Sequence, residues 1–274
     1  DLIRKHSVDK VLVAIPEIQG ARLRELVDLC SGHHVKFKLV PSFSAMVASG
    51  DAGPVTLQDV EPEDLLDRHP VTFDHSRMAA FFVDKTVLVT GAAGSIGAEL
   101  CRQVVAQSVK RLVALDMDEN GLYFLRLDLQ ERAPKVSLRL EVANIREPER
   151  MDAVFAAYRP DIVFHAAAHK HVPLMEYCPA EALRNNVLGT RNLAASADRH
   201  GAERFVLIST DKAVNPTNVM GASKHLAERI VRDFNGRSET RLMAVRFGNV
   251  LGSNASLVPI LQRQIARGGP VTVT

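Results

Sequence analysis

One segment, residues 85–97 with the sequence KTVLVTGAAGSIG, constrains the fold of this chain more than any other. An apolar, β-branched stretch over Thr86–Thr90 predicts a buried strand, which leads through glycines spaced three apart into a helix expected over Ala98–Gln107. Glycines let the backbone turn tightly and approach a ligand, while the amides and dipole at a helix start favour negative charge. The segment therefore predicts a pyrophosphate site, and the expected ligand is a dinucleotide.

The acidic residue Asp116 narrows the choice of dinucleotide. It follows a second predicted strand, Arg111–Leu115, and lies about twenty residues beyond the glycines, where a carboxylate accepts hydrogen bonds from the adenosine ribose hydroxyls. Because a carboxylate there repels a 2′-phosphate, NAD is expected rather than NADP. The alternative is an ordinary glycine turn followed by a solvent-facing acid, and it leaves the full order of strand, turn, helix, strand and acid unexplained.

Strand and helix patterns alternate through residues 83–274 and predict an NAD-binding catalytic domain of the α/β class. The expected architecture is a doubly wound parallel sheet, the Rossmann fold, in which ligands bind outside the carboxyl ends of the strands. Residues directly after each strand are therefore the candidates for a site. The predicted strands are Thr86–Thr90, Arg111–Leu115, Ser137–Val142, Ile162–Ala166, Arg204–Ser209 and Arg241–Arg246.

A partial second nucleotide-fold domain is expected over residues 1–50. A strand at Lys10–Ile15, a helix at Ala21–Cys30 and a strand at Phe37–Val40 form one βαβ unit, which is too small to cover both faces of its own sheet. Residues 51–82 predict an acidic, proline-containing linker and a connecting helix. The chain starts at Asp1 and ends in a strand-like PVTVT, so we expect a fragment of a longer protein, truncated within its catalytic domain.

Composition and charge exclude several classes of function. The net charge is +2, basic and acidic residues are interspersed and tryptophan is absent, so the chain offers neither a phosphate-tracking surface nor a stacking platform for nucleic acid. No apolar stretch approaches the roughly twenty residues that span a bilayer, and no signal-peptide pattern opens the chain. The cysteines are widely spaced and predict free, packed thiols in a reducing cytosol; they are Cys30, Cys101 and Cys178.

Several motifs at the predicted strand ends and in the segments after them resemble one enzyme family. Besides the glycine turn, they are FHAAA at 164–168, NVLGT at 186–190, STDK at 209–212, MGASK at 220–224 and RFGN at 246–249. Together they resemble the extended short-chain dehydrogenases/reductases. More narrowly, residues 83–274 resemble bacterial polysaccharide-biosynthesis UDP-N-acetylglucosamine 4,6-dehydratases, including the large membrane-anchored members. The 57–70 connection and the preceding βαβ unit resemble the region before the catalytic domain in those members.

The resemblance implies a catalytic group in which one residue departs from the family pattern. The family places a Ser or Thr, a Tyr and a Lys around the nicotinamide; Thr210 and Lys224 match, but Met220 stands where the Tyr is usual. A thioether has no proton to exchange, so Met220 is expected only to pack against a ligand or ring. A subset of the large dehydratases has Met at this place, and the best remaining base is then Asp211.

For a dehydratase, the resemblance implies three steps on the hexose. Oxidation at C4 acidifies C5, the C5 proton and the C6 hydroxyl then leave as water, and the same hydride returns to C6. Neutral Lys212 is expected to take the C5 proton, and protonated Asp211 to donate to the leaving C6 oxygen. Thr210 would hydrogen-bond the C4 oxygen, while Lys224 would hold the nicotinamide ribose and favour alkoxide formation. The competing interpretation is that Asp211 and Lys212 form a solvated surface pair.

Further binding residues are expected at other strand ends. Lys170 is a candidate substrate contact, with a surface lysine as the equal alternative, and Asn249 matches the family position at the substrate diphosphate. Asn144 and Ile145 replace the more usual Asp–hydrophobic pair near adenine, which predicts a weaker contact there. The complete set of expected cofactor contacts is Gly91, Ala93, Gly94, Ser95, Ile96, Asp116, Asn144, Ile145, Ala166, Ala167, Ala168 and Lys224.

Other polar residues near these motifs are expected to be structural. His165, His169 and His171 lie on a strand end and a loop without the spacing of metal ligands, so no metal site is expected. Asn186 is expected to have a structural polar role in its helix, and Arg246 is interpreted as a buried strand-end cation.

The primary hypothesis is an NAD-dependent UDP-N-acetylglucosamine 4,6-dehydratase, a lyase of surface-glycan synthesis. A UDP-sugar C4 epimerase would share the cofactor half, but it is expected to keep the Tyr and has no need of Asp211 and Lys212. A catalytically silent NAD-binding module of a glycan-assembly complex is the other alternative, which Met220 leaves open. The expected partners are a UDP-sugar and, as a further candidate, a second copy of the chain. By resemblance, the longer protein is tethered to the inner membrane with this portion in the cytoplasm.

Overall fold

A computed structural model describes residues 2–15, 18, 20–33, 35–40, 75–248, 250 and 257–271. The chain divides into two compact units, Asp1–Thr72 with Ile260–Thr274 and Phe73–Pro259. The predicted linker up to residue 74 and the predicted diphosphate contact Asn249 lie outside the described residues.

The smaller unit contains the predicted βαβ arrangement. Strands β1 (Lys10–Val13) and β2 (Lys36–Leu39) pair in parallel, as expected when a helix connects them. That helix, α2 (Gly20–Gly32), is longer at both ends than its apolar pattern predicted, and it buries Leu23 and Cys30. The short helix α1 (Leu2–Lys5) precedes β1, and α12 (Leu257–Ala266) lies near the end of the chain.

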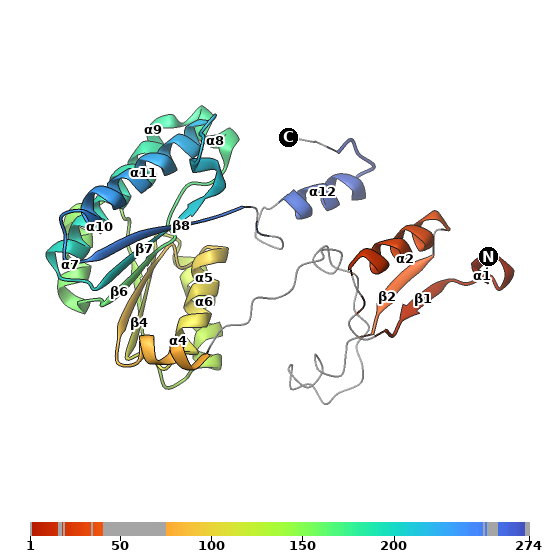
Figure 1. Cartoon of the computed structure of the whole chain (residues 1–274), viewed down its shortest axis with the longest axis horizontal. Coiled ribbons are helices and arrows are strands. Elements are labelled where there is room, and N and C mark those ends of the chain that lie inside the picture. The colour runs from red at the N-terminus through yellow and green to blue at the C-terminus, as the bar shows by residue number, and fades with distance from the viewer. Residues whose placement is uncertain are drawn as a thin grey trace. The chain divides into compact units, whose positions relative to one another are not determined.

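Six parallel strands form the sheet of the larger unit, in the order β5-β4-β3-β6-β7-β8 (Figure 1). The order reverses between β3 and β6, and this switch point is where doubly wound folds bind their ligands. The predicted doubly wound parallel sheet is confirmed, and each strand keeps its predicted start. The strands are β3 (Thr86–Thr90), β4 (Arg111–Asp116), β5 (Ser137–Val142), β6 (Ile162–His165), β7 (Arg204–Thr210) and β8 (Arg241–Phe247).

Helices cover both faces of this sheet (Figure 1). Helices α4, α5 and α6 supply the apolar residues of one core, and α7, α10 and α11 supply those of the other. A π-helical turn over Leu183–Gly189 and a 3₁₀ turn over Asp211–Ala213 interrupt the regular pattern. The helices are α4 (His75–Phe82), α5 (Ser95–Val105), α6 (Glu119–Arg132), α7 (Pro148–Tyr158), α8 (Val172–Tyr177), α9 (Pro179–Ala182), α10 (Thr190–Arg199) and α11 (Val219–Asn235).

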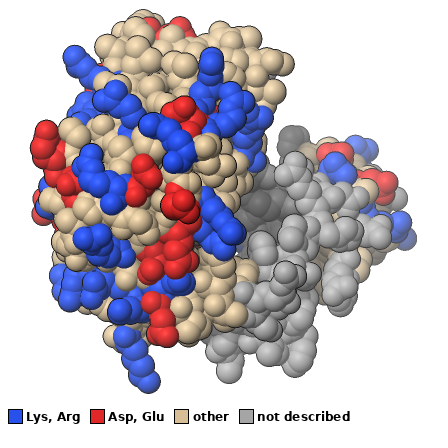
Figure 2. Space-filling view, turned by 60° about the vertical axis from the view of Figure 1, so that its left-hand side comes forward, with Lys and Arg blue, Asp and Glu red and all other residues tan. Residues whose placement is uncertain are grey.

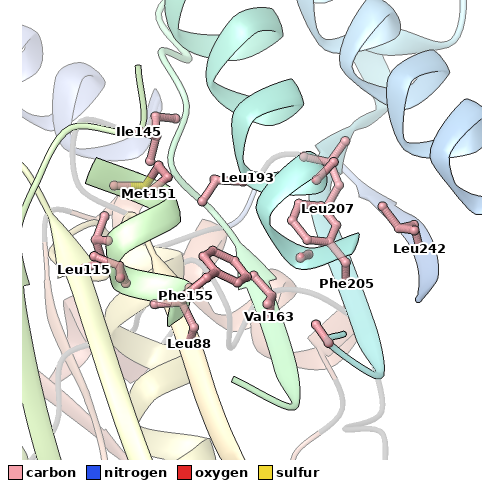
Figure 3. Close-up of a cluster of buried hydrophobic side chains, with 14 of the residues drawn as sticks. Leu88, Leu115, Ile145, Met151, Phe155, Val163, Leu193, Phe205, Leu207 and Leu242 are labelled. Carbon is pink, nitrogen blue, oxygen red and sulfur yellow. The ribbon is translucent and has the colours of Figure 1, made fainter. Parts of the chain in front are cut away.

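Strand β3 contributes to both cores because successive side chains of a strand point to opposite faces. Leu88 packs in one core with Phe155, which Figure 3 shows beside Leu88 and Val163. Val87 and Val89 pack in the other core, against α5 and α6. Close packing on both faces fixes the position of the β3 carboxyl end, where the glycine turn begins.

The predicted free cysteines differ in burial. Cys30 and Cys101 are buried, but Cys178 is exposed, so the expectation that all three are packed is wrong for Cys178. Cys178 lies at the junction of α8 and α9, as the C-cap of the first helix and the N-cap of the second. Within the described ranges, no helix is both long and apolar enough to span a bilayer. On the face seen in Figure 2, basic and acidic side chains are interspersed.

Candidate functional site

Two cavities lie at the carboxyl ends of the strands and share part of their walls. The larger has a volume of about 530 Å³ and is lined by the ends of β7 and α11; the smaller, of about 220 Å³, is lined by the ends of β4 and β5. An elongated ligand that crosses the shared wall can occupy both. That wall consists of Gly91, Gly94, Ala166, Ala168 and His169.

The glycine turn is packed so closely that two of its glycines admit no side chain. A Cβ on Gly91, whose φ is +71°, would lie 2.4 Å from the Ala167 nitrogen. A Cβ on Gly97 would lie 1.9 Å from the Gly91 carbonyl oxygen. Gly94 differs, because a Cβ there would meet only the Gly91 oxygen, at 3.4 Å. The missing Cβ of Gly94 thus leaves an open space, the Gly94 cradle, in the wall that both cavities share.

Helix α5 begins at Ser95, three residues earlier than its apolar pattern predicted. Gly94 is its N-cap, with extended backbone angles of φ −75° and ψ 163°, and Ser95 and Ile96 line the larger cavity. The first amides of a helix have no acceptor within it and carry the positive end of its dipole. No acidic residue occupies the first turn of α5. The cradle therefore fits a pyrophosphate.

Asp116, the predicted ribose-binding carboxylate, lines the smaller cavity. Its Oδ2 accepts a hydrogen bond of 2.9 Å from the Ala93 amide, and its Oδ1 accepts one of 3.1 Å from the Asp118 amide. These two bonds fix the carboxylate against the glycine turn and leave further lone pairs for ligand hydroxyls. Ala93 itself lines neither cavity. Its amide holds Asp116, and its contact with the cofactor stays a prediction.

Asn144 and Ile145 both line the smaller cavity, but each has a structural task there. The Asn144 Oδ1 accepts bonds of 3.0 and 3.1 Å from the backbone N and the Nε of Arg146. Ile145 is 4% exposed and packs in the core against Gly189. The amide oxygen of Asn144 thus accepts two bonds from its own loop, and the adenine contact of this residue stays a prediction.

The loop after β6 is fixed by Asn186, a buried residue of the π-helical turn. Asn186 accepts a bond of 2.8 Å from the His169 amide and donates one of 3.0 Å to the His169 carbonyl. It also donates to the Ser223 hydroxyl at 2.9 Å, and Ser223 donates to the Met220 carbonyl at 2.7 Å. One amide side chain therefore joins the loop that lines both cavities to the start of α11. Lys170, in the same loop, is exposed and lines the larger cavity.

His165 is part of a buried polar chain beneath the site. Its two ring nitrogens lie 2.8 Å from the Thr90 hydroxyl and 2.9 Å from the Thr190 hydroxyl. Burial, and then the charge of nearby Lys224, lowers the pKa of His165 to about 3, so the ring is neutral. Within the described part of the chain, no group of three or more His, Cys, Asp or Glu side chains could hold a metal ion.

Thr210, Asp211 and Lys212 form a hydrogen-bonded cluster at the end of β7. The Thr210 hydroxyl donates to the Asp211 carboxylate at 2.9 Å, and the Lys212 ammonium donates to the same oxygen at 3.1 Å. These bonds hold the pKa of Asp211 below its ordinary value. Asp211 is therefore ionised in this structure, whereas the predicted acid role requires its protonated form. Thr210 and Lys212 line the larger cavity; Asp211 does not, but it lies beside Gly248 of that wall.

Lys224 and Met220 form the buried side of the larger cavity. Each is 4% exposed, and both line the cavity from one face of α11. The Lys224 ammonium donates to the Ile208 carbonyl at 2.8 Å, and burial lowers the pKa of Lys224 to about 8. Met220 packs with Met175 of α8, and its thioether supplies no proton. Met175, which also lines this cavity, was not predicted from the sequence, since a short helix within a loop has no periodic signal.

The model of the polysaccharide biosynthesis protein family matches residues 87–274. The chain belongs to this family. It is 45% identical over 273 residues to EpsC of Bacillus subtilis (strain 168), described as a probable polysaccharide biosynthesis protein, covering 99% of the chain and 46% of EpsC. It is 44% identical over 276 residues to the capsular polysaccharide biosynthesis protein CapD of Staphylococcus aureus, covering 100% of the chain and 46% of CapD. The chain thus spans about half the length of these relatives.

Solved structures share the fold of this family member. Pen from Bacillus thuringiensis matches with a TM-score of 0.66 and 34% identity, covering 71% of this chain and 61% of Pen. DesIV, a dTDP-glucose 4,6-dehydratase from Streptomyces venezuelae solved with NAD, matches with a TM-score of 0.59 and 23% identity, covering 68% and 63%. The glycine turn, the sheet order and the place of the Lys224 helix thus belong to a fold that these solved structures share.

Proposed function

We propose that this chain is the NAD-dependent catalytic part of a 4,6-dehydratase, a lyase. It acts on UDP-N-acetylglucosamine or a close UDP-hexosamine and yields a UDP-4-keto-6-deoxy sugar for surface polysaccharide. The observation that carries the proposal is the cluster of Thr210, Asp211 and Lys212 at a cavity whose buried wall holds Met220 in place of a phenol. Three titratable or hydroxyl groups joined in this way can move the protons of an elimination.

NAD is the cofactor of this site. The cradle at Gly94 would hold the pyrophosphate, Asp116 would accept from the ribose hydroxyls at the smaller cavity, and Lys224 would contact the nicotinamide ribose at the larger. When bound, NAD supplies the oxidant for C4 and afterwards the hydride for C6. Support for NAD over NADP comes from the Asp116 carboxylate, which faces the smaller cavity with its negative charge.

The charge state of Asp211 makes it the base of the first step. Thr210 receives the C4 hydroxyl proton and passes its own proton along its 2.9 Å hydrogen bond to Asp211. The positive charge of Lys224 favours the alkoxide that develops at C4. The carboxylate thus begins as a base and ends the step protonated, which supplies the acid that the sequence analysis required of it.

The elimination uses the same two side chains in the next step. The Lys212 ammonium, which donates to Asp211, releases a proton to solvent before this step, so that its neutral amine can act as a base. Lys212 takes the C5 proton, which the C4 ketone acidifies, and Asp211 gives its proton to the C6 hydroxyl, which leaves as water. Lys212 then returns the proton to C5, and C6 receives the hydride that C4 gave up. Lys212 finally regains from solvent the proton that it had released, so that atoms and charges balance.

A C4 epimerase is the second candidate, and the relatives described as UDP-glucose 4-epimerases favour it. The UDP-glucose 4-epimerase of Rickettsia canadensis (strain McKiel) is 38% identical over 200 residues, covering 70% of this chain and 57% of the epimerase. Epimerisation needs a base for the C4 hydroxyl but no acid at C6, so it leaves Lys212 without a task. The dehydratase therefore accounts for more of the site. Oligomerisation and a tether of the longer protein to the inner membrane stay predictions.

Mass spectrometry of the product formed in deuterated water tests the proposal. The longer protein that contains this chain, given NAD and UDP-N-acetylglucosamine, should yield a product lighter by one water with deuterium at C5. Asp211→Asn and Lys212→Ala should each remove that product, whereas the exposed control Lys135→Ala should retain it. An unchanged mass with inverted C4 would support the epimerase, and NAD binding without either product would support a silent module.

A further inference from the structure

Glu228 is a largely buried carboxylate that the proposed reaction does not use. It lies one helical turn after Lys224 on α11, and its side chain is 11% exposed. The Oε1 accepts bonds from the Ser209 hydroxyl at 2.5 Å and from the Arg246 Nε at 2.9 Å. The Oε2 accepts a second Arg246 bond, at 2.5 Å. A carboxylate with this many close donors is held in one orientation.

These bonds connect three of the segments that line the larger cavity. Ser209 precedes Thr210 at the end of β7, and Arg246 precedes Phe247 and Gly248 at the end of β8. Ser209 and Arg246 face each other in the β7–β8 register. Glu228 ties both strand ends to the helix that carries Lys224. Arg246 is 46% exposed, so its interpretation as a buried cation is wrong; it is the ion-pair partner of Glu228.

The charges around Lys224 give Glu228 a second effect. Burial lowers the pKa of Lys224, and the negative charge of Glu228 opposes that shift. His165 of β6 also interacts with Lys224, but its pKa of about 3 leaves it uncharged. Arg246 of β8 is paired with Glu228, and Asp211 is paired with Lys212 at η2, the 3₁₀ turn. Another carboxylate near this helix, Glu176 of α8, accepts a bond from the Val219 amide.

We propose that Glu228 is a positioning residue that fixes the ends of β7 and β8 against α11 and keeps the Lys224 amine protonated. The inference rests on the proposed function in that Lys224 serves the cofactor there. Arg246 sets the strength of this effect, because its guanidinium offsets part of the Glu228 charge. Removal of Glu228 and removal of Arg246 should therefore shift the protonation of Lys224 in opposite directions.

The test compares Glu228→Gln and Arg246→Gln with the control Asp233→Asn, which removes an exposed carboxylate of the same helix. The readout is the pH midpoint for acylation of Lys224 by acetic anhydride, followed by peptide mass spectrometry without any nucleotide-sugar. Glu228→Gln should lower the midpoint by about one pH unit, and Arg246→Gln should raise it by a similar or smaller amount. Asp233→Asn should leave it unchanged. The affinity for NADH, measured by NADH fluorescence between pH 6 and 10, should decrease as the pH rises through the Lys224 midpoint. The pH of this decrease should shift in each variant as the acylation midpoint does.

Two results would overturn the inference: equal midpoints in all variants, or shifts of Glu228→Gln and Arg246→Gln in the same direction. A protein that is merely destabilised gives no opposite pair of shifts. Should Glu228→Gln fail to fold, Arg246→Gln decides alone, since its site is half exposed. Because labelling of Lys224 needs no turnover, a failure of the dehydratase proposal leaves this result readable.

Discussion

The Lys224 ammonium donates a hydrogen bond of 2.8 Å to the Ile208 carbonyl, the backbone group two residues before the Thr210 hydroxyl. This bond holds the amine at the wall of the larger cavity, where burial lowers its pKa from 10.5 to about 8. Burial of the Lys224 ammonium therefore destabilises the folded protein, as burial of charged groups at active sites often does. This loss can be measured as a difference in the free energy of unfolding.

Replacing Lys224 by Met should stabilise the protein. The lowered pKa means that burial of the charged amine destabilises the folded protein by roughly 3 kcal/mol below pH 8. In the variant the Ile208 carbonyl loses its donor, which costs roughly 1 kcal/mol. The expected gain is about 2 kcal/mol at pH 7, measured by urea unfolding. As the pH rises from 8 to 10.5, the wild-type amine loses its charge in the folded state first, so the gain should vanish. The exposed control Lys110→Met should change little, and a Lys224→Met protein less stable at pH 7 would contradict the argument.

Turnover should decline as the pH rises through about 8. The folded Lys224 loses its proton there, and with it the charge that favours the C4 alkoxide. The rate of formation of the dehydrated sugar, followed by chromatography over pH 6 to 10, checks this expectation. Lys224→Arg keeps its charge throughout that range and should flatten the alkaline limb, even if its rate is lower. A limb that stays at the same pH in Lys224→Arg would assign it to another group.

Two alanine substitutions in the glycine turn should have different outcomes. At Gly97 the added methyl would lie 1.9 Å from the Gly91 carbonyl oxygen, so the turn must move and several kcal/mol of stability should be lost. At Gly94 the methyl meets only the Gly91 oxygen at 3.4 Å, so the protein should fold normally. Gly94→Ala fills the cradle, however, and should weaken NADH at least about tenfold by fluorescence titration. Unaltered NADH affinity in Gly94→Ala would place the pyrophosphate elsewhere.

Asp116→Ala should weaken NAD and reduce its preference over NADP. The substitution removes the acceptor for the ribose hydroxyls and the charge that repels a 2′-phosphate, so the ratio of NADPH to NADH affinity should rise about tenfold or more. Fluorescence titration with both nucleotides measures the ratio. The neighbouring carboxylate Asp118, which accepts from the Gly121 amide as the α6 N-cap, is the matched control. Asp118→Ala should lower stability by about 1 kcal/mol and leave the ratio unchanged.

Asn186→Ala should loosen the loop that lines both cavities. The His169 amide and carbonyl and the Ser223 hydroxyl would each lose a partner, at a cost of about 2–4 kcal/mol for this buried network. Hydrogen exchange at the His169 amide should accelerate by at least tenfold, while amides of β3 keep their protection relative to global unfolding. The exposed Asn120→Ala on α6 serves as control. Equal acceleration at all amides would mean that Asn186 contributes only to overall stability.

The sequence predicted the sheet well because its signals are local. Six apolar segments carry their own strand preference, and the glycine turn marks the first βα unit, so each strand start agrees with the prediction. The helix after the turn was predicted too late, because Ser95 and Ile96 belong to the motif and not to an apolar stripe. Cys178 was predicted as packed because residue type alone favours burial, yet it lies at a junction of two short helices.

What the sequence determined by itself is the order of elements and the set of residues at the strand carboxyl ends, since periodicity and glycine spacing act between near neighbours. Only the tertiary structure decided how those residues are paired. Three features depend on which side chains meet and on how deeply they are buried. They are the lowered pKa of Asp211, the hydrogen bonds between Asn186 and the His169 backbone, and the Glu228–Arg246 ion pair. Distances and dielectric surroundings between segments far apart in the chain set protonation, and a linear pattern does not contain them.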